Sequence, residues 1–144
     1  MADIFSKRKR SEIMSKIGPK NSSFEFHIAR TLRSLKLSFV RHGKLLPGKP
    51  DFVFPKKKKV IFVHGCFWHG HRNCRRSSLP KTNGNFWKKK ISSNVKRDMS
   101  GCRKLNQRGW SYLVLWQCKI GKLTPVQLSS RINKFLKSGI NRNC

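Results

Sequence analysis

The sequence predicts an α/β fold in which a mixed central sheet is flanked by helices on both sides, with the element order αβββαβα. Apolar residues recur at helical spacing in three segments, and four short apolar runs lie between or beside them. Proline and glycine residues separate the first three of these runs, as expected for strands that are joined by turns. A length of 144 residues suits one hydrophobic core rather than two.

The first predicted helix begins at Ser22 or Ser23, either of which can cap it. Glu25 falls in its first turn, where the helix dipole favours an acidic side chain. One face of this helix carries Phe24, Ile28, Leu32 and Leu35. Residues 1–20 are predicted to form a basic N-terminal arm, and residues 21–144 a single domain.

Three strands are predicted next, over residues 38–42, 51–54 and 60–64. The turn-forming run at 47–50 separates the first two, and Pro55 with four lysines at 56–59 connects the second to the third. These runs are short and rich in β-branched and aromatic residues, which favours strands over helices.

The second half of the sequence predicts a loop, a long helix, a strand and a last helix. Residues 65–84 have no periodicity and concentrate histidine, cysteine, glycine and arginine, so this loop is organised around something other than a hydrophobic core. A helix from Asn85 to Gln107 follows, and Gly109 ends it before a strand at 110–116. Thr124 caps the last helix. The apolar faces of the two helices are Phe86, Ile91, Val95, Met99, Cys102 and Leu105, and then Val126, Leu128, Ile132, Phe135 and Leu136.

The charge balance indicates a nucleic-acid partner. The chain has 34 lysines and arginines against 5 acidic residues, a net charge of +29. Repulsion on this scale disfavours a compact state unless a polyanion neutralises it, and binding through phosphates is salt-sensitive. A ribosomal-type RNA binder and a lysine-biased genome are alternatives, but such a bias does not explain the shortage of acids.

Other features of composition bear on where the protein works. No apolar run is long enough to span a membrane, and the N-terminus lacks the apolar region of a secretory signal. Three of the five cysteines lie near histidines or beyond a strand, which fits a metal site better than paired disulfides. We therefore expect a cytoplasmic, DNA-associated monomer.

The acidic residues are informative because they are so few: Asp3, Glu12, Glu25, Asp51 and Asp98. Mg²⁺ needs hard oxygen ligands, so metal-dependent phosphodiester chemistry must draw on this set. Asp51 begins a strand after a glycine–proline turn that allows close approach of a DNA backbone, and Asp98 lies on the long helix. The alternatives are a role at the end of the sheet for Asp51 and an ion pair for Asp98.

Histidines and cysteines are concentrated between His64 and Cys74. Cys66, His71 and Cys74 supply three ligands for a tetrahedral Zn²⁺, and Cys118 is a candidate for the fourth. The spacing does not choose among the histidines of this loop. A buried cysteine beside an ordinary loop histidine is the alternative interpretation.

Two further histidines and two aromatic residues in this region suggest chemistry on DNA. His64 and His69 are candidates to accept a proton from an attacking water near Asp51, with a carboxylate such as Asp98 orienting the ring. Phe67 and Trp68 either insert between bases or cover the metal loop.

These motifs resemble those of one known family. The segments Leu46–Val53, Val60–Gly70, Pro80–Asn83, Asn94–Asp98 and Leu115–Cys118 are similar, in this order, to the very-short-patch-repair (Vsr) mismatch endonucleases. The run Gly65-Cys66-Phe67-Trp68-His69 is the most specific of them. The resemblance covers residues 8 to 120 and implies the restriction-endonuclease fold, which agrees with the αβββαβα order.

The resemblance also implies roles for individual residues. Asp51 would hold a catalytic Mg²⁺ together with the main-chain carbonyl of Val63. His69 would activate or position the attacking water, Asp98 would orient it, and Glu25 and His64 would support the site.

A structural zinc site and a DNA wedge are implied in the same way. The zinc ligands would be Cys66, His71, Cys74 and Cys118. Phe67, Trp68 and Trp87 would enter beside the mismatch from the major groove and Met14 from the minor groove, while the basic arm closes over the DNA.

The implied activity is cleavage of double-stranded DNA at a T:G mismatch, 5′ to the mispaired thymine. Family members act on mismatches that arise when 5-methylcytosine is deaminated, and the family also implies a link to the mismatch-repair protein MutL. A mismatch stacks poorly, so inserting aromatic side chains there costs less than at a Watson–Crick pair.

Some positions depart from related sequences. Gln117 stands where many members of the family have glutamate, while Phe62 and His64 stand where the wider nuclease superfamily has a second acid and a lysine. Two other functions remain open: a nicking enzyme of the same fold with a different mismatch or sequence trigger, and a non-catalytic, zinc-stabilised DNA-binding module.

Overall fold

The computed structural model describes residues 23–138, so the predicted basic arm and Met14 lie outside the described residues. Its sheet has four strands in the order β1 (Val40–Arg41), β2 (Phe52–Phe54), β3 (Lys59–His64) and β4 (Ser111–Trp116). β1 pairs with β2 and β2 pairs with β3 in antiparallel fashion, whereas β3 pairs with β4 in parallel. The predicted mixed α/β fold is therefore confirmed, and it is consistent with a restriction-endonuclease-like core.

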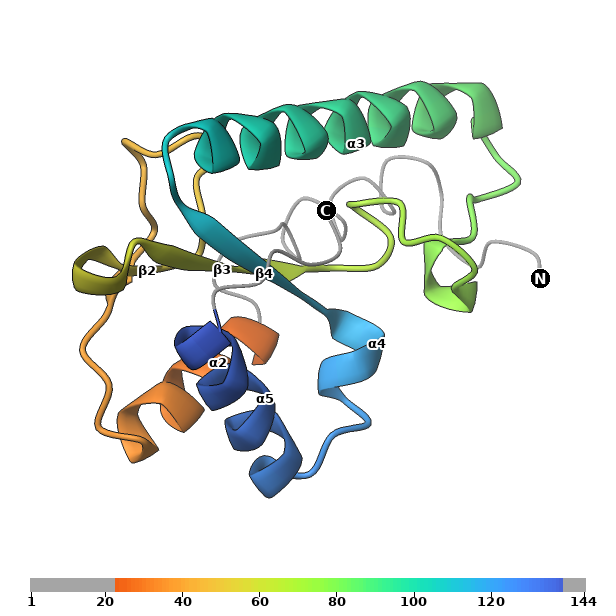
Figure 1. The fold of residues 1–144 in the computed structure, drawn as a ribbon. Helices are drawn as coiled ribbons and strands as arrows, with labels where there is room; N and C mark the ends of the chain where they lie inside the picture. Colours follow the sequence, from red (N-terminus) through yellow and green to blue (C-terminus); the bar gives the residue numbers. More distant parts are fainter. Residues whose placement is uncertain (1–22, 139–144) are drawn as a thin grey trace.

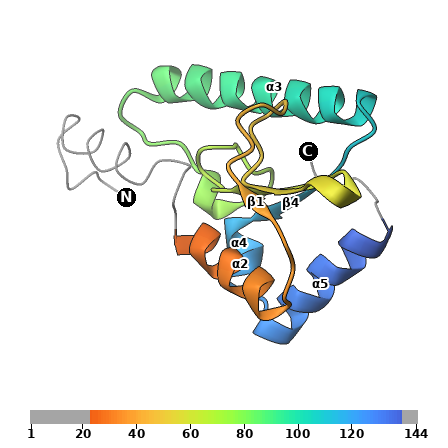
Figure 2. The ribbon, with the colours of Figure 1, turned by 90° about the vertical axis from the view of Figure 1, so that its left-hand side faces the viewer.

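Helices cover both faces of this sheet (Figures 1 and 2). The long helix α3 (Gly84–Gln107) lies on one face, while α2 (Ser23–Ser34) and α5 (Pro125–Ser138) lie on the other with the short helix α4 (Gln117–Ile120). Two 3-10 turns, η1 (Pro55–Lys57) and η2 (Arg75–Ser77), complete the described elements. None of the described helices is long and apolar enough to cross a membrane.

Alternation along β3 explains how one sheet supports two cores. Ile61 and Val63 pack among residues of α2 and α5, whereas Val60 and Phe62 pack against α3 through Cys102 and Leu105. Because successive side chains of a strand point to opposite faces, a run of buried residues in β3 is what a central strand between two helical layers requires. The helices on each face are therefore held by separate apolar clusters.

The ends of the helices follow the local sequence closely. Thr124 and Gln127 form a reciprocal cap at the start of α5: the Gln127 amide donates to Thr124 Oγ1 at 3.2 Å, and the Thr124 amide donates to Gln127 Oε1 at 3.0 Å. The predicted capping role of Thr124 is thus confirmed. Helix α3 spans nearly the range predicted from its periodicity.

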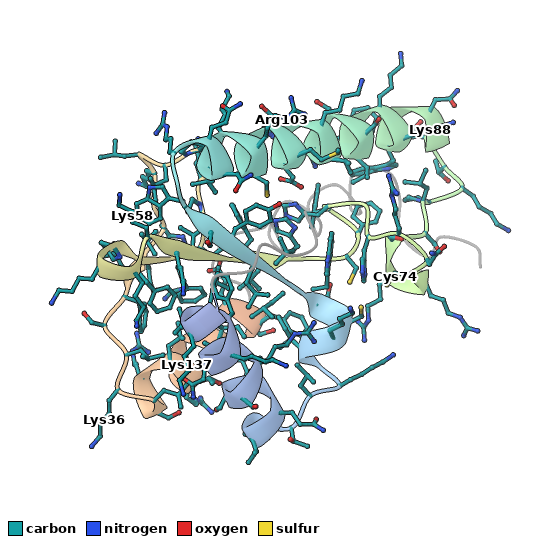
Figure 3. All side chains as sticks on the ribbon, in the orientation of Figure 1. Lys36, Lys58, Cys74, Lys88, Arg103 and Lys137 are labelled. Carbon is teal, nitrogen blue, oxygen red and sulfur yellow. The ribbon has the colours of Figure 1, made fainter. Side chains whose placement is uncertain are left out.

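The buried face of α3 differs from the predicted one. Phe86 and Met99 are 56% and 47% exposed, whereas Trp87 is only 6% exposed. The reason is that the N-terminal half of α3 packs on the loop 65–84 rather than on the sheet: a Cβ added to Gly70 would lie 2.9 Å from the side chains of Ile91 and Val95. Charged residues of α3 such as Lys88 and Arg103 point away from the molecule (Figure 3).

The short helix α4 was not predicted. The last strand ends at Trp116 as expected, but the chain then turns at once into α4, so that Cys118 lies on a helix rather than at a strand end. Ile120 of this helix is buried in the cluster under α2 and α5. Four residues are too few for helical periodicity to show in the sequence.

Candidate active site and metal centre

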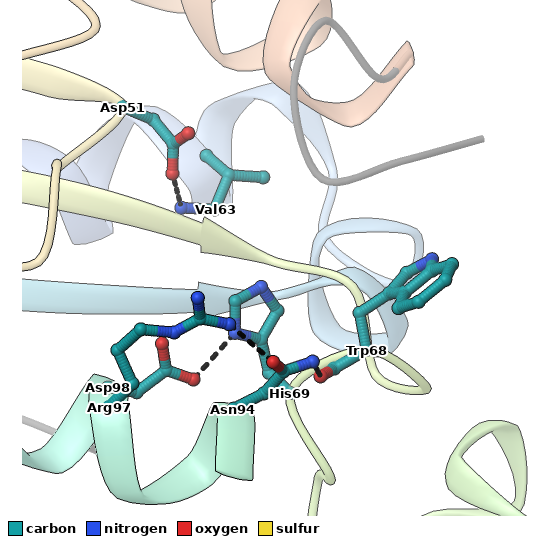
Figure 4. Close-up of polar contacts among 7 residues, drawn as sticks. All are labelled: Asp51, Val63, Trp68, His69, Asn94, Arg97 and Asp98. Atoms are coloured by element: carbon teal, nitrogen blue, oxygen red, sulfur yellow. Dashed lines mark hydrogen bonds and ion pairs between the residues drawn. The ribbon is translucent and has the colours of Figure 1, made fainter. Parts of the chain in front are cut away.

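The candidate active site lies at one end of the sheet. Asp51 directly precedes β2, and β3, which runs antiparallel to it, ends at His64. The two strands therefore bring Asp51 to the same end as His64 and the loop that follows. The Val63 amide donates to Asp51 Oδ2 at 2.6 Å, which fixes the carboxylate against β3 (Figure 4).

Two more titratable side chains surround the Asp51 carboxylate. Ligand atoms of Glu25, His42 and Asp51 all lie within 4.8 Å of one another. Glu25 is fully buried, with Arg41 Nη2 at 3.2 Å and His42 Nε2 at 3.9 Å from its Oε2. Burial, and next the hydrogen bond with Glu25, raise the pKa of Asp51 to about 9. Two carboxyl groups held close together, one fully buried and the other half-buried, are an unfavourable arrangement that a divalent cation would relieve.

A second group of titratable residues adjoins the first. His69 Nδ1 lies 2.6 Å from Asp98 Oδ2, and the His69 ring stacks on that of His64, with centroids 3.8 Å apart and planes within 2°. A carboxylate accepts the Nδ1 proton, so Nε2 of His69 is left to accept another. Burial, together with the nearby His69 and His71, holds the pKa of His64 well below its ordinary value, which favours a neutral ring in the stack.

A cavity of about 420 Å³ connects the two groups. Asp51, His69 and Asp98 all line it. They reach it from three different elements: the start of β2, the loop after β3, and α3. The remaining lining residues are Gly48, Lys49, Phe62, Val63, His64 and Arg97. The cavity is therefore lined by two acidic side chains, a histidine that can accept a proton and the basic side chains of Lys49 and Arg97, as a phosphodiester substrate would require.

The cysteine-rich loop builds a separate cluster. Ligand atoms of Cys66, His71, Cys74 and Cys118 lie within 4.8 Å of one another, and the three cysteines are free. His71 Nδ1 is 3.5 Å from Cys118 Sγ, and its ring stacks on Trp116 at 4.1 Å. Burial raises the pKa of Cys66 to about 12. Three sulfur donors and one imidazole in a compact group are a donor set that fits a tetrahedral metal ion.

The structure places in different clusters the histidines that the sequence could not tell apart. His71 joins the cysteines, whereas His69 pairs with Asp98 and His64 stacks on His69. All of the ligands that the sequence suggested for zinc thus come together, with Cys118 brought in by α4.

The aromatic residues form one connected group. Phe67 contacts Trp68 and Trp87 edge-on, with centroids 5.4 and 5.5 Å apart, and Trp68 lies 6.1 Å from Trp87. Phe67 and Trp68 are half-buried, but Trp87 is buried beneath them. Of the three predicted wedge residues in the described part of the chain, two are therefore partly accessible, and the third supports them.

Four residues of the site region were missed by sequence reasoning. His42 and Arg41 surround Glu25 because β1 pairs with β2, and the His42 amide donates to the Asp51 carbonyl at 2.9 Å. Asn94 donates from its side chain to the Trp68 carbonyl at 3.0 Å and accepts a hydrogen bond from Arg97 (Figure 4). A histidine at the end of a strand preceding Asp51 was a usable signal for His42. Asn94 and Arg97 lie in the segment Asn94–Asp98 that resembles the family, but no role was assigned to them, and Arg41 had no signal beyond its place in a predicted strand.

Comparisons with known proteins agree with this geometry. The family model described as DNA mismatch endonuclease Vsr matches residues 2–76. A type II nicking enzyme of Xanthomonas oryzae pv. oryzae, V.XorIIP, is 40% identical over 91% of this chain and 96% of its own length. The DNA mismatch endonuclease Vsr of Escherichia coli (strain K12) is 37% identical over 94% of this chain and 88% of its own. A type II nicking enzyme of Neisseria meningitidis serogroup A, V.NmeAIP, is 38% identical over 83% and 85%.

Proposed function

This chain belongs to the Vsr family of DNA mismatch endonucleases, and from that premise we propose that it cuts one strand of double-stranded DNA on the 5′ side of the thymine in a T:G mismatch, with Mg²⁺ as the catalytic metal. That it is an endonuclease acting on DNA follows from the family. The mismatch, the metal and the roles of the individual residues are the proposal.

One observation carries the proposed chemistry: the Asp51 carboxylate and the His69–Asp98 pair face the same cavity. A hydrolytic nuclease needs a hard anionic ligand for a metal and a group that takes a proton from water, within reach of one phosphate. These two groups reach the cavity from separate parts of the chain, yet they converge on it. Two of the three acidic residues described, Asp51 and Asp98, line this cavity, and the third, Glu25, lies beside Asp51.

The residues around Asp51 fit the requirements of Mg²⁺. Asp51 would hold it together with the main-chain carbonyl of Val63, with Glu25 as a neighbouring acid. Bound there, Mg²⁺ would supply Lewis-acid chemistry that stabilises negative charge on the phosphate. The Val63 amide orients the Asp51 carboxylate, and Arg41 holds Glu25 in place.

His69 would act as the general base. Asp98 accepts the Nδ1 proton of His69, which fixes the tautomer in which Nε2 takes a proton from the attacking water. Asp98 then stabilises the imidazolium that forms. Stacking on His64 fixes the plane of the ring, and the low pKa of His64 keeps a second positive charge away from it.

The other predicted residues would bind and read the substrate. Cys66, His71, Cys74 and Cys118 would hold a structural Zn²⁺ that shapes the loop carrying His69. Phe67 and Trp68, supported by Trp87, would enter the stack at the mismatch, where unstacking costs least. A T:G pair left by deamination of 5-methylcytosine would be the natural substrate.

A different trigger is the second candidate function, because several relatives carry the name of type II nicking enzymes. In that case, the same active site would cut DNA at another mismatch or at a recognition sequence. The two candidates share the chemistry and differ only in which duplexes are cut.

The first test is a nicking assay with a labelled duplex that carries one T:G mismatch, in Mg²⁺ and near-physiological salt. Matched T:A and C:G duplexes and a panel of other mismatches serve as controls. We expect a single nick 5′ to the mispaired thymine, which is lost in Asp51→Ala while binding is largely kept. Nicking by Asp51→Ala at the wild-type rate would overturn the mechanism, and equal nicking of the matched duplexes would overturn the T:G trigger.

A further inference from the structure

His42 lies beside the proposed metal ligand Asp51, but it has no part in the proposed reaction. Ligand atoms of His42, Glu25 and Asp51 lie within 4.8 Å of one another, and we call these three residues the trio. The side chain of His42 is 25% exposed, and that of Glu25 is fully buried. The members of the trio come from different elements, since His42 follows β1, Glu25 is in the first turn of α2 and Asp51 precedes β2.

The pairing of β1 with β2 fixes the position of His42 relative to Asp51. Arg41 pairs with Phe52, so His42 and Asp51 form the next opposite pair along the two strands. The His42 amide donates a hydrogen bond to the Asp51 carbonyl at 2.9 Å, which extends the ladder to this pair. The backbone therefore holds the imidazole close to the Asp51 carboxylate before any metal binds.

The distance between His42 and Glu25 suits two ligands of one ion better than a direct hydrogen bond. His42 Nε2 is 3.9 Å from Glu25 Oε2, which is too long for a hydrogen bond. Donor atoms that each lie about 2.1 Å from one octahedral ion are about 3 to 4.2 Å apart. In the neutral ring with its proton on Nδ1, the contact with Glu25 thus leaves the Nε2 lone pair available to a metal ion.

The donor atoms of the trio determine which ions it favours. Two carboxylates and one imidazole offer two oxygen donors and one nitrogen donor. Mg²⁺ binds through oxygen ligands and keeps several of its waters, whereas divalent transition-metal ions also accept imidazole. The nitrogen of His42 should therefore add affinity for a transition-metal ion and little for Mg²⁺.

His42 and Glu25 do not line the active-site cavity. Asp51 lines it together with His69 and Asp98, so Asp51 is the residue that the trio and the cavity share. His42 would accordingly hold an ion at Asp51 without taking the space that the phosphate and the attacking water need.

We propose that His42 is a third protein ligand, with Asp51 and Glu25, of the metal ion at the active site, and that its imidazole makes the site bind a divalent transition-metal ion more tightly than Mg²⁺. The inference rests on the proposed function only in that Asp51 holds the metal. Mg²⁺ would still bind through the two carboxylates, but more weakly.

The test measures metal binding to the full-length protein without DNA, so that it does not depend on nicking. Mn²⁺ is the probe: the EPR signal of the free ion gives its affinity, and competition against it gives the affinity for Mg²⁺. Pulsed EPR of bound Mn²⁺ detects a directly coordinated nitrogen. The variant is His42→Ala, and the matched control is His27→Ala, two residues after Glu25 and therefore on another side of α2. Asp51→Asn tests the site itself.

We expect the Mn²⁺ affinity of His42→Ala to fall roughly 10-fold or more, while its Mg²⁺ affinity stays within about three-fold of the wild type. The nitrogen signal should be present in the wild type and in His27→Ala, and absent from His42→Ala. Asp51→Asn should lose both ions.

The outcomes separate this inference from the proposed function. Unchanged Mn²⁺ affinity in His42→Ala, an equal loss of both ions, an equal loss in His27→Ala, or a nitrogen signal that does not depend on His42 would each overturn the role of His42 and leave Asp51 as a metal ligand. Full Mn²⁺ binding by Asp51→Asn would overturn the proposed metal site and this inference with it.

Discussion

At the scale of single residues, the half-buried Asp51 carboxyl links the proposed metal binding to pH. Without a metal, its folded pKa is raised from 3.8 to about 9 by burial and by Glu25. A group whose folded pKa is raised contributes stability that is complete below its unfolded pKa and is lost as the pH rises through the folded value. The metal-free protein should therefore lose stability from this group between about pH 4 and pH 9. The proposed Mg²⁺ would bind the charged form and should therefore restore it.

We predict that the rise in melting temperature caused by Mg²⁺ is small at pH 6 and grows toward pH 9. Thermal unfolding with and without Mg²⁺ across this range measures it. In Asp51→Asn, which keeps the shape but cannot ionise, the effect of Mg²⁺ should vanish at every pH. A Mg²⁺ effect of the same size at pH 6 and pH 8.5, or one that survives in the variant, would rule out Asp51 as the ligand.

At the scale of elements, the contact between α3 and the turn before β2 sets the distance between the two halves of the site. A Cβ added to Gly101 would lie 2.7 Å from Gly48 Cα and 2.9 Å from its nitrogen, closer than real contacts allow. Gly101 lies three residues after Asp98 on α3, and Gly48 lies three residues before Asp51. A change in the distance between these two glycines would therefore move Asp98, which would orient the proposed general base His69, relative to the proposed metal ligand Asp51.

Gly101→Ala should accordingly reduce the rate of nicking by up to about 100-fold, because small misplacements of catalytic groups have effects of this size. We expect the stability to fall by only about 1–3 kcal/mol, the usual effect of overpacking. Single-turnover nicking, measured at a temperature where the variant is folded, tests this. Gly84→Ala on the same helix is the matched control, because a Cβ there meets nothing within 4 Å. A folded Gly101→Ala with a normal rate would show that the contact does not position the site.

The sequence predicts the secondary-structure elements better than the contacts between them. The order of strands and long helices follows from periodicity and from proline and glycine, and the structure confirms it. The buried face of α3 does not follow, because Trp87 packs against a loop whose shape no local pattern encodes. The acids of the site could be named because they are rare, whereas His42 joins them through β1–β2 pairing between distant positions. Contacts of this kind depend on tertiary structure rather than on local propensity.

At the scale of the whole molecule, the two sheet faces and the cysteine loop are stabilised in different ways. The sheet packs on α2 and α5 through one apolar cluster and on α3 through another. Most of the loop 65–84 lies outside both clusters, although it carries His69 and supports the N-terminal half of α3. The group formed by Cys66, His71, Cys74 and Cys118 is therefore the main candidate for holding the loop in shape.

If the cluster holds the proposed zinc ion, its removal should consequently damage one end of the molecule more than the other. We predict that Cys66→Ser loses bound zinc and melts roughly 10 °C or more below the wild type, since structural zinc contributes directly to folding. Cys74→Ser should have a smaller effect, because Cys66 is fully buried while Cys74 is partly exposed. Mass spectrometry measures the bound zinc, and hydrogen exchange measures which segments open. Exchange should rise first in the loop and in the first turns of α3. Unchanged zinc content and melting temperature in Cys66→Ser, or a rise in exchange that begins in the sheet, would refute a zinc-held loop. In that event, the stacking of His71 on Trp116 and the aromatic contacts of Phe67 would have to be enough to order it.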